Sequence, residues 1–145
     1  MAISSEICNS FKQEILVATH NFTASTGDTF KLALYTSSAT LGASTTVYSA
    51  TNEITNDAGS AYVAGGQNLT SVTPVLDSST AVCDFNDISW TSASFTANGC
   101  LIYNSSKSNK AVCAIAFGSD KTVTTGTFTI QFPNADSSDA IVRIT

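Results

Sequence analysis

One histidine and a few aspartates are the residues of this sequence whose types first suggest chemistry. His20 is the only histidine, so a nucleophile of the Ser–His–Asp or Cys–His kind would have to use it. Nothing near it resembles the G-x-S-x-G motif in which a nucleophilic serine sits on a sharp turn. We therefore interpret His20 as a junction residue that makes one hydrogen bond, and we predict that the chain is not an enzyme.

Asp84 and Asp87 stand close together in the segment CDFNDISW. Clustered carboxylate oxygens are typical of sites for hard cations such as calcium. The segment lacks the glycine and the closing glutamate of an EF-hand loop, so we predict a polar turn whose carboxylates accept hydrogen bonds from backbone amides. Asp136 and Asp139 suggest another solvated turn. The sequence accordingly predicts no metal site and no cofactor.

The cysteines show neither a C-x-x-C pair nor a zinc-ligand spacing. Most of them fall within apolar strand patterns, and we predict that they are small buried hydrophobic residues. A β-sandwich would allow a disulfide between Cys83 and Cys100 or between Cys100 and Cys113. A reducing cytosol argues against both. The cysteines are Cys8, Cys83, Cys100 and Cys113.

Charge is scarce in this sequence and limits the classes of partner. Charged residues make up 12% of the 145 residues, the net charge is −5, and the six lysine and arginine residues are scattered. Because a phosphate-binding surface needs clustered cations, we predict that the chain binds neither nucleic acid nor an anionic membrane. No leader sequence or membrane-spanning stretch is visible, so we expect synthesis and folding in a cytosol.

The elements that would position these residues begin with one helix. Ile7, Phe11 and Ile15 recur at a spacing of four, which predicts an amphipathic helix from Glu6 to about Val17, with Ser5 as its N-cap. We expect residues 1–20 to form a helical arm in front of a β-sandwich of residues 21–145, all in a single domain. The apolar stripe of the arm needs a cover, either the domain itself or a neighbouring subunit.

The rest of the chain is typical of strands and turns. Ser37–Gly59 is rich in small polar residues; we predict a surface excursion with little to bury and one short strand near Thr46–Ser49. Asn56–Gly59 and Gly65-Gly66 are turn signals, and Trp90 is predicted to be a core residue. The predicted strands are Thr29–Thr36, Gln67–Val75 (ending near Pro74), Ala81–Phe85, Ile88–Trp90, Phe95–Asn104, Ala111–Phe117, Thr127–Phe132 and Ala140–Thr145, with a turn at Gly118–Lys121.

About eight short strands without intervening helices predict an all-β fold. We expect an antiparallel, jelly-roll-like β-sandwich preceded by the short N-terminal helix. The order of the strands is not fixed by the sequence.

Several blocks of the sequence, in the same order, resemble a family of small virion proteins from tailed bacteriophages and prophages. Together with Ser10–Leu16 (SFKQEIL) the resemblance covers nearly the whole chain. No catalytic motif comes with it. The blocks are Phe30–Glu53 (FKLALYTSSATLGASTTVYSATNE), Ala61–Thr70 (AYVAGGQNLT), Trp90–Asn104 (WTSASFTANGCLIYN) and Phe128–Ile144 (FTIQFPNADSSDAIVRI).

The resemblance implies a structural protein displayed in many copies on a virion. Our first hypothesis is a capsid decoration or cement protein that binds the major capsid protein, with a homotrimer favoured. A tail, baseplate or fibre-associated subunit is the alternative, and a β-sandwich module that binds host glycan through Trp90 and Tyr103 is a third hypothesis. For partner binding we nominate residues of the N-terminal helix and of the Ser37–Gly59 excursion: Ile7, Phe11, Ile15, Leu41, Val47 and Tyr48.

Overall fold

The computed structural model describes residues 2–55 and 61–145. The predicted turn at Asn56–Gly59 lies outside the described residues. The regular elements of the described residues are strands and one short helix. The predicted all-β class is therefore confirmed. The elements are β1 (Glu6–Ile7), α1 (Asn9–Leu16), β2 (Phe30–Tyr35), β3 (Gln67–Asn68), β4 (Ser71–Asp77), β5 (Thr80–Phe85), β6 (Ile88–Asn104), β7 (Lys110–Ile130) and β8 (Val142–Ile144).

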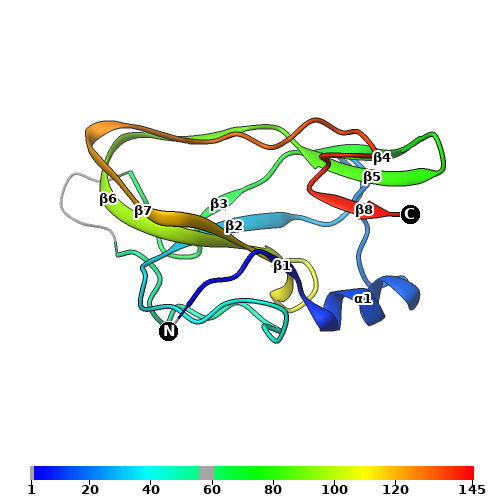
Figure 1. The fold of residues 1–145 in the computed structure, drawn as a ribbon, viewed down its shortest axis with the longest axis horizontal. Helices are drawn as coiled ribbons and strands as arrows, with labels where there is room; N and C mark the ends of the chain where they lie inside the picture. The colour runs from blue at the N-terminus through cyan, green and yellow to red at the C-terminus, as the bar shows by residue number, and fades with distance from the viewer. Residues whose placement is uncertain (1, 56–60) are drawn as a thin grey trace.

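The described strands form two antiparallel sheets. The larger sheet has the order β1-β7-β6-β2-β3, and the smaller has the order β4-β5-β8. Figure 1 shows the smaller sheet at one end of the molecule, above α1, and β2 in the lower layer. The predicted antiparallel sandwich with a short N-terminal helix is confirmed, and the structure supplies the strand order that the sequence left open.

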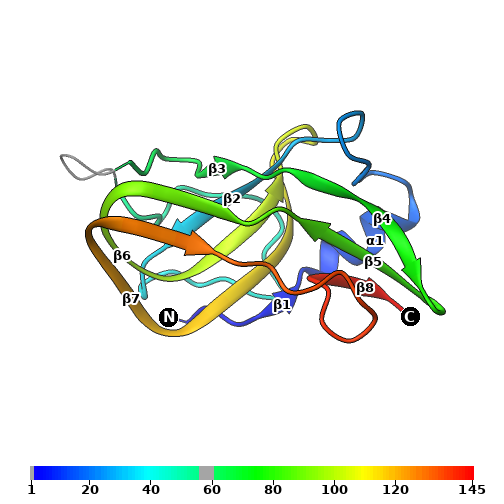
Figure 2. The ribbon, with the colours of Figure 1, turned by 90° about the horizontal axis from the view of Figure 1, so that it is seen from above.

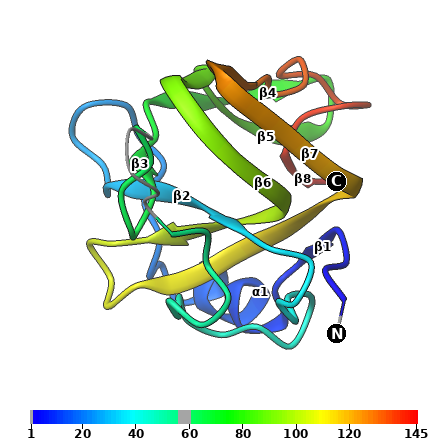
Figure 3. The ribbon, with the colours of Figure 1, turned by 90° about the vertical axis from the view of Figure 1, so that its left-hand side faces the viewer.

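A long hairpin of β6 and β7, both strands of the larger sheet, bends so that it contributes to both layers of the sandwich. Its two strands run along the upper layer, curl at one end and return in the lower layer (Figures 1 and 3). The predictions of separate strands at Ile88–Trp90 and Phe95–Asn104 are therefore wrong, because both belong to β6. The predicted turn at Gly118–Lys121 is wrong too: residues 117–120 of β7 lie opposite Asn98 alone, which makes a bulge in a continuous strand.

The bulge explains why the sequence suggested a break. Gly118 has a φ of +80°, a conformation that glycine adopts without strain and that also occurs in turns. The extra residues bend β7 and carry it from one layer into the other. Ala111–Phe117 and most of Thr127–Phe132 thus lie in the same strand, on opposite sides of the bend.

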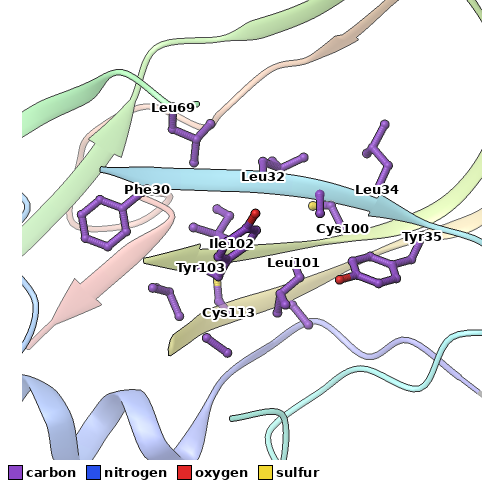
Figure 4. Packing of buried hydrophobic residues seen from close by; sticks show 14 of the residues in the cluster. Phe30, Leu32, Leu34, Tyr35, Leu69, Cys100, Leu101, Ile102, Tyr103 and Cys113 are labelled. Carbon is purple, nitrogen blue, oxygen red and sulfur yellow. The ribbon is translucent and has the colours of Figure 1, made fainter. Parts of the chain in front are cut away.

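The core lies between the layers. Phe30, Leu32 and Leu34 of β2 pair with Asn104, Ile102 and Cys100 of β6, which places their side chains on one face of the larger sheet. Figure 4 shows part of this cluster. Trp90 is 5% exposed and contacts the rings of Tyr62, Phe95 and Phe128, so its predicted place in the core is confirmed.

The N-terminal helix is shorter than predicted. Glu6 and Ile7 pair with Ala114 and Cys113 of β7 as strand β1, and α1 begins only at Asn9. Ser5 is not the N-cap, because its Oγ accepts a hydrogen bond from the amide of Ala116. Pairing with an open edge of β7 satisfies backbone groups that a longer helix would have left to solvent.

The predicted strand Gln67–Val75 is also corrected. Gln67–Asn68 pairs with β2, whereas Ser71–Asp77 pairs with β5 in the other sheet. Pro74 does not end the second strand, which continues to Asp77. Pro74 lies on an edge strand, at a register shift between Val72 and Val75. Because the regular ladder is interrupted there, the missing amide hydrogen of proline costs no hydrogen bond between strands.

The segment 37–55 covers the outer face of the larger sheet. Tyr48 stacks on Tyr103 of β6 with ring centroids 4.6 Å apart, and Ala39 and Ile54 are buried. Figure 1 shows this segment below β2, β6 and β7. The prediction of an excursion with little to bury is therefore wrong, and the short strand predicted near Thr46–Ser49 reduces to a single bridge between Val47 and Lys110.

Candidate partner-binding surface

The six nominated residues are divided between core and surface. Phe11 is 3% exposed and packs against Phe22 and His20, so its side chain belongs to the chain's own core. Ile7 lies on β1 and Ile15 on α1, and both are half-buried. The helix stripe that the sequence suggested as a docking face is thus mostly turned towards the domain.

The nominated residues of the excursion lie on the cover segment. Leu41 forms a parallel bridge with Ile3 and is half-buried. Tyr48 is held between the ring of Tyr103 and the carboxylate of Glu53. Val47 is 47% exposed, so among these three only Val47 presents a largely accessible apolar side chain.

A buried carboxylate joins the cover segment to the residues that lead into β3. Glu53 Oε1 accepts hydrogen bonds from the Tyr62 hydroxyl at 2.5 Å and from the Gly65 amide at 2.7 Å, and Oε2 accepts one from the Tyr48 hydroxyl at 2.6 Å. Burial, with the Glu53 hydrogen bond, raises the pKa of both tyrosines, so both remain donors at neutral pH. Sequence reasoning missed this site because no local pattern marks a buried glutamate, although its donors lie only 5 to 12 residues away along the chain.

The Gly65-Gly66 turn beside this carboxylate is confirmed. The Tyr103 hydroxyl donates to the Gly65 carbonyl at 2.6 Å. Gly66 has a φ of +78°, and a Cβ there would lie 1.8 Å from the Leu32 carbonyl oxygen. Only glycine fits this close approach to β2, which explains why the turn carries that residue.

A second buried polar cluster fixes α1 against the hairpin. Glu14 of α1 lies 3.0 Å from Lys110 Nζ and 3.7 Å from His20 Nε2. The amide nitrogen of Asn104 lies 3.0 Å from His20 Nδ1 and donates to Asp28 at 2.8 Å. His20 makes one hydrogen bond, with Asn104, as predicted, and its Nε2 faces Glu14 without a hydrogen bond.

The charge state of this cluster follows from its burial. Burial outweighs the neighbouring carboxylates and lowers the pKa of His20, so the imidazole is neutral at pH 7. For Asp28 burial works in the opposite direction, but hydrogen bonds from Asn104 and the Asn21 amide prevail and lower its pKa. The cluster thus holds a neutral histidine between two carboxylates and does not supply a cationic acid.

The other sequence candidates for chemistry have structural roles. Asp84 accepts a hydrogen bond from the Phe85 amide, as predicted, and Asp87 accepts one from the distant Phe132 amide. Burial raises the pKa of the Cys8 and Cys83 thiols to about 11, so they stay protonated at neutral pH. The four cysteines are free. The described residues hold no group of three histidine, cysteine or acidic side chains placed to bind a metal ion.

The helix α1 and the smaller sheet lie at the same end of the molecule (Figures 1 and 2), and each carries exposed apolar side chains. Leu16 of α1 is 84% exposed and Leu76 of β4 is 73% exposed. Ile144 of β8 is 55% exposed and lines, with Ile15, a largely apolar groove of about 530 Å³ between α1 and this sheet. We call Leu16, Leu76, Ile144 and this groove the apolar end.

A second groove of similar volume opens between β1 and the residues that lead to β8. It is lined by Ile7 and Phe117 on one side and by Phe132 and Ile141 on the other. In contrast, Trp90 and Tyr103 are buried, so neither offers the exposed ring that binding of a glycan by stacking would use.

Comparisons with known proteins add no identification. No family model, no curated protein and no solved structure matches the chain. In the part of the chain that is described, no helix is both long and apolar enough to cross a membrane.

Proposed function

We propose that this chain is a structural protein of a bacteriophage virion, made in the bacterial cytoplasm and bound to the outside of the shell as a capsid decoration protein. The order of sequence blocks shared with small virion proteins motivates the proposal. The observation that carries it is the apolar end, where Leu16, Leu76 and Ile144 stay exposed. Exposed apolar side chains around a groove are typical of surfaces that bind another protein.

The scarcity of charge supports the same role. Charged residues make up 12% of the chain, so contacts to a shell would rest on apolar burial and neutral hydrogen bonds. Such contacts depend little on ionic strength. The role is mechanical rather than catalytic: each copy adds buried area between capsid subunits, and about 800 Å² per partner suffices for a stable contact.

Location and copy number in the parent particle test this proposal. Quantitative mass spectrometry and cryo-electron microscopy of purified particles should find hundreds of copies spread over the shell. A few copies at one vertex would instead favour a tail or baseplate subunit. Absence from the particle would refute a virion role altogether.

A pair of matched variants tests the surface. Shells that lack the protein are incubated with wild type, Leu76→Lys or Val63→Lys, and bound protein is measured by co-sedimentation. Leu76 lies at the apolar end, whereas Val63 is a similarly exposed apolar residue, 63% accessible, outside it. We expect at least about tenfold weaker binding for Leu76→Lys and unchanged binding for Val63→Lys. Equal binding of the two variants would exclude the apolar end as the contact surface.

A further inference from the structure

The upper half of β7 has one edge without a partner strand. Lys121–Ile130 pairs with β6 on one side, and β1 reaches only Cys113 and Ala114 in the lower half. Among the residues that the structure describes, none outside β6 makes a backbone hydrogen bond to Lys121–Ile130. Figure 3 shows β6 along the inner side of this segment and no strand along its outer side.

This edge lacks most of the features that prevent strands from pairing between molecules. Lys121–Ile130 (KTVTTGTFTI) contains no proline, is rich in β-branched residues and carries a single charge, at Lys121. Exposed backbone donors and acceptors along such a segment fit one kind of partner, which is another extended strand.

A bulge in the middle of the edge determines how a second copy can pair with it. The register shifts between the pairs Ala93–Gly126 and Phe95–Val123, and Thr125 has a φ of +44°. Regular pairing with β6 remains on either side of the bulge, over residues 121–123 and 128–130. In an antiparallel pair of identical strands these two stretches lie opposite each other, and the two bulges meet at the twofold axis.

The charges at the ends of the edge complement each other in that arrangement. Lys121 begins the edge, and Asp139 lines the same groove as Thr129 and Ile130 at its other end. Both side chains are exposed, and neither takes part in an ion pair among the described residues. An antiparallel twofold therefore brings Lys121 of each copy towards Asp139 of the other, twice per dimer.

We propose that the free edge of β7, Lys121–Ile130, pairs antiparallel with the same edge of a second copy of this chain. The upper-layer halves of β6 and β7 then form a continuous four-stranded layer across a twofold axis. This inference rests on the edge and its charges and holds whether or not the chain belongs to a virion. It predicts an even-numbered oligomer rather than the trimer favoured under the capsid decoration hypothesis.

Charge reversal with rescue tests this inference. The dissociation constant of the full chain is measured by sedimentation velocity over a dilution series. Lys121→Glu should weaken the dimer at least about tenfold, since two like-charged contacts replace two ion pairs. Adding Asp139→Lys to that variant should restore affinity to within about threefold of wild type. Lys12→Glu is the control, because Lys12 is an exposed residue of α1 and the change in net charge is the same.

Several outcomes would overturn the proposal. For the wild type, a chain that stays monomeric at every concentration or that forms a trimer would contradict it. For the variants, equal effects of Lys121→Glu and Lys12→Glu, or a double variant that dimerises no more tightly than Lys121→Glu, would contradict it. Hydrogen exchange of the wild type gives a reading that needs no variant. The amides of Lys121–Ile130 that point away from β6 should exchange more slowly as concentration rises, and protection of these amides that does not change with concentration would also contradict the pairing.

Discussion

Glu14 and Glu53 are both buried in this protein, and they differ in the groups that replace their contacts with water. Glu53 accepts three hydrogen bonds of 2.7 Å or less from Tyr48, Tyr62 and Gly65. Glu14 has an ion pair with the partly exposed Lys110 at 3.0 Å, while its oxygens lack any hydrogen bond with good geometry. A buried carboxylate such as that of Glu53, whose lost water contacts are replaced by fixed donors, holds its segment firmly. A buried carboxylate such as that of Glu14, whose main partner is a flexible lysine ammonium, holds its segment less firmly.

The difference matches what each glutamate connects. Glu53 ties the cover segment to the residues that lead into β3, beside a sheet that buries residues on both faces. Glu14 ties α1 to the hairpin at the apolar end, where side chains are exposed. The comparison predicts that changes around Glu53 destabilise the fold strongly and that changes around Glu14 destabilise it only weakly.

The largest expected effect is that of Glu53→Gln. The amide group that replaces one oxygen would face a tyrosine hydroxyl or the Gly65 amide, both donors, so at least one buried donor loses its acceptor. We expect a loss of about 3 kcal/mol in the free energy of unfolding, measured with urea. A loss below about 1 kcal/mol would contradict the inference that Glu53 stabilises the fold more than Glu14 does.

Removing a single tyrosine hydroxyl should have the next largest effect. The Tyr62 hydroxyl donates to Glu53 and accepts from the Leu34 amide at 2.9 Å. Tyr62→Phe should therefore cost about 2 kcal/mol, the range for a hydrogen bond to a charged group. Tyr35→Phe is the control, since this buried hydroxyl donates only to the neutral Ser49 carbonyl, and we expect about 1 kcal/mol. Equal losses would mean that the charge of Glu53 adds nothing.

The Glu14 region should account for the pH dependence near neutrality. His20 has a lowered pKa in the folded state, so below about pH 6.5 the unfolded chain binds a proton that the folded chain does not. Stability is complete above that pH and falls as the pH drops, by at most about 1.4 kcal/mol per pH unit. Urea unfolding between pH 8 and 5 should show this slope, and His20→Gln should remove it. A slope that persists in the variant would mean that a group other than His20 causes the pH dependence of stability.

The smallest expected effect is that of Glu14→Gln. The glutamine keeps the shape and removes a charge whose main partner is partly exposed, so the change in the free energy of unfolding should not exceed about 1 kcal/mol. This variant is the matched counterpart of Glu53→Gln in the same denaturation experiment. A loss as large as that of Glu53→Gln would show that both carboxylates stabilise the fold equally.

Much of the fold could be predicted from periodicity alone. The alternation around Phe30–Tyr35 and the apolar run Ala111–Phe117 predicted strands that the structure contains. Trp90 is in the core as expected. These features follow from a rule with short range, because the faces of a strand alternate from residue to residue and burial selects apolar side chains on one or both faces.

The candidate sites were harder to predict because their parts are distant along the chain. Glycine and proline at Gly118 and Pro74 suggested strand ends, but both lie within strands at a bulge or an edge. The N-terminal stripe suggested a docking helix, yet Phe11 packs into the domain. In each case the local signal was real, and the partner that decided its meaning came from another segment.

The sequence by itself determined that this chain is an all-β protein with a short N-terminal helix, few charges and apolar strands. Only the tertiary structure decided that segment 37–55 covers a sheet, that β6 and β7 form one bent hairpin, and that Glu53 and His20 are buried. The physical reason is that a side chain's own type limits whether it can be buried. Whether a polar group is buried depends on donors and acceptors that the topology brings from far away, as Asn104 is brought to His20.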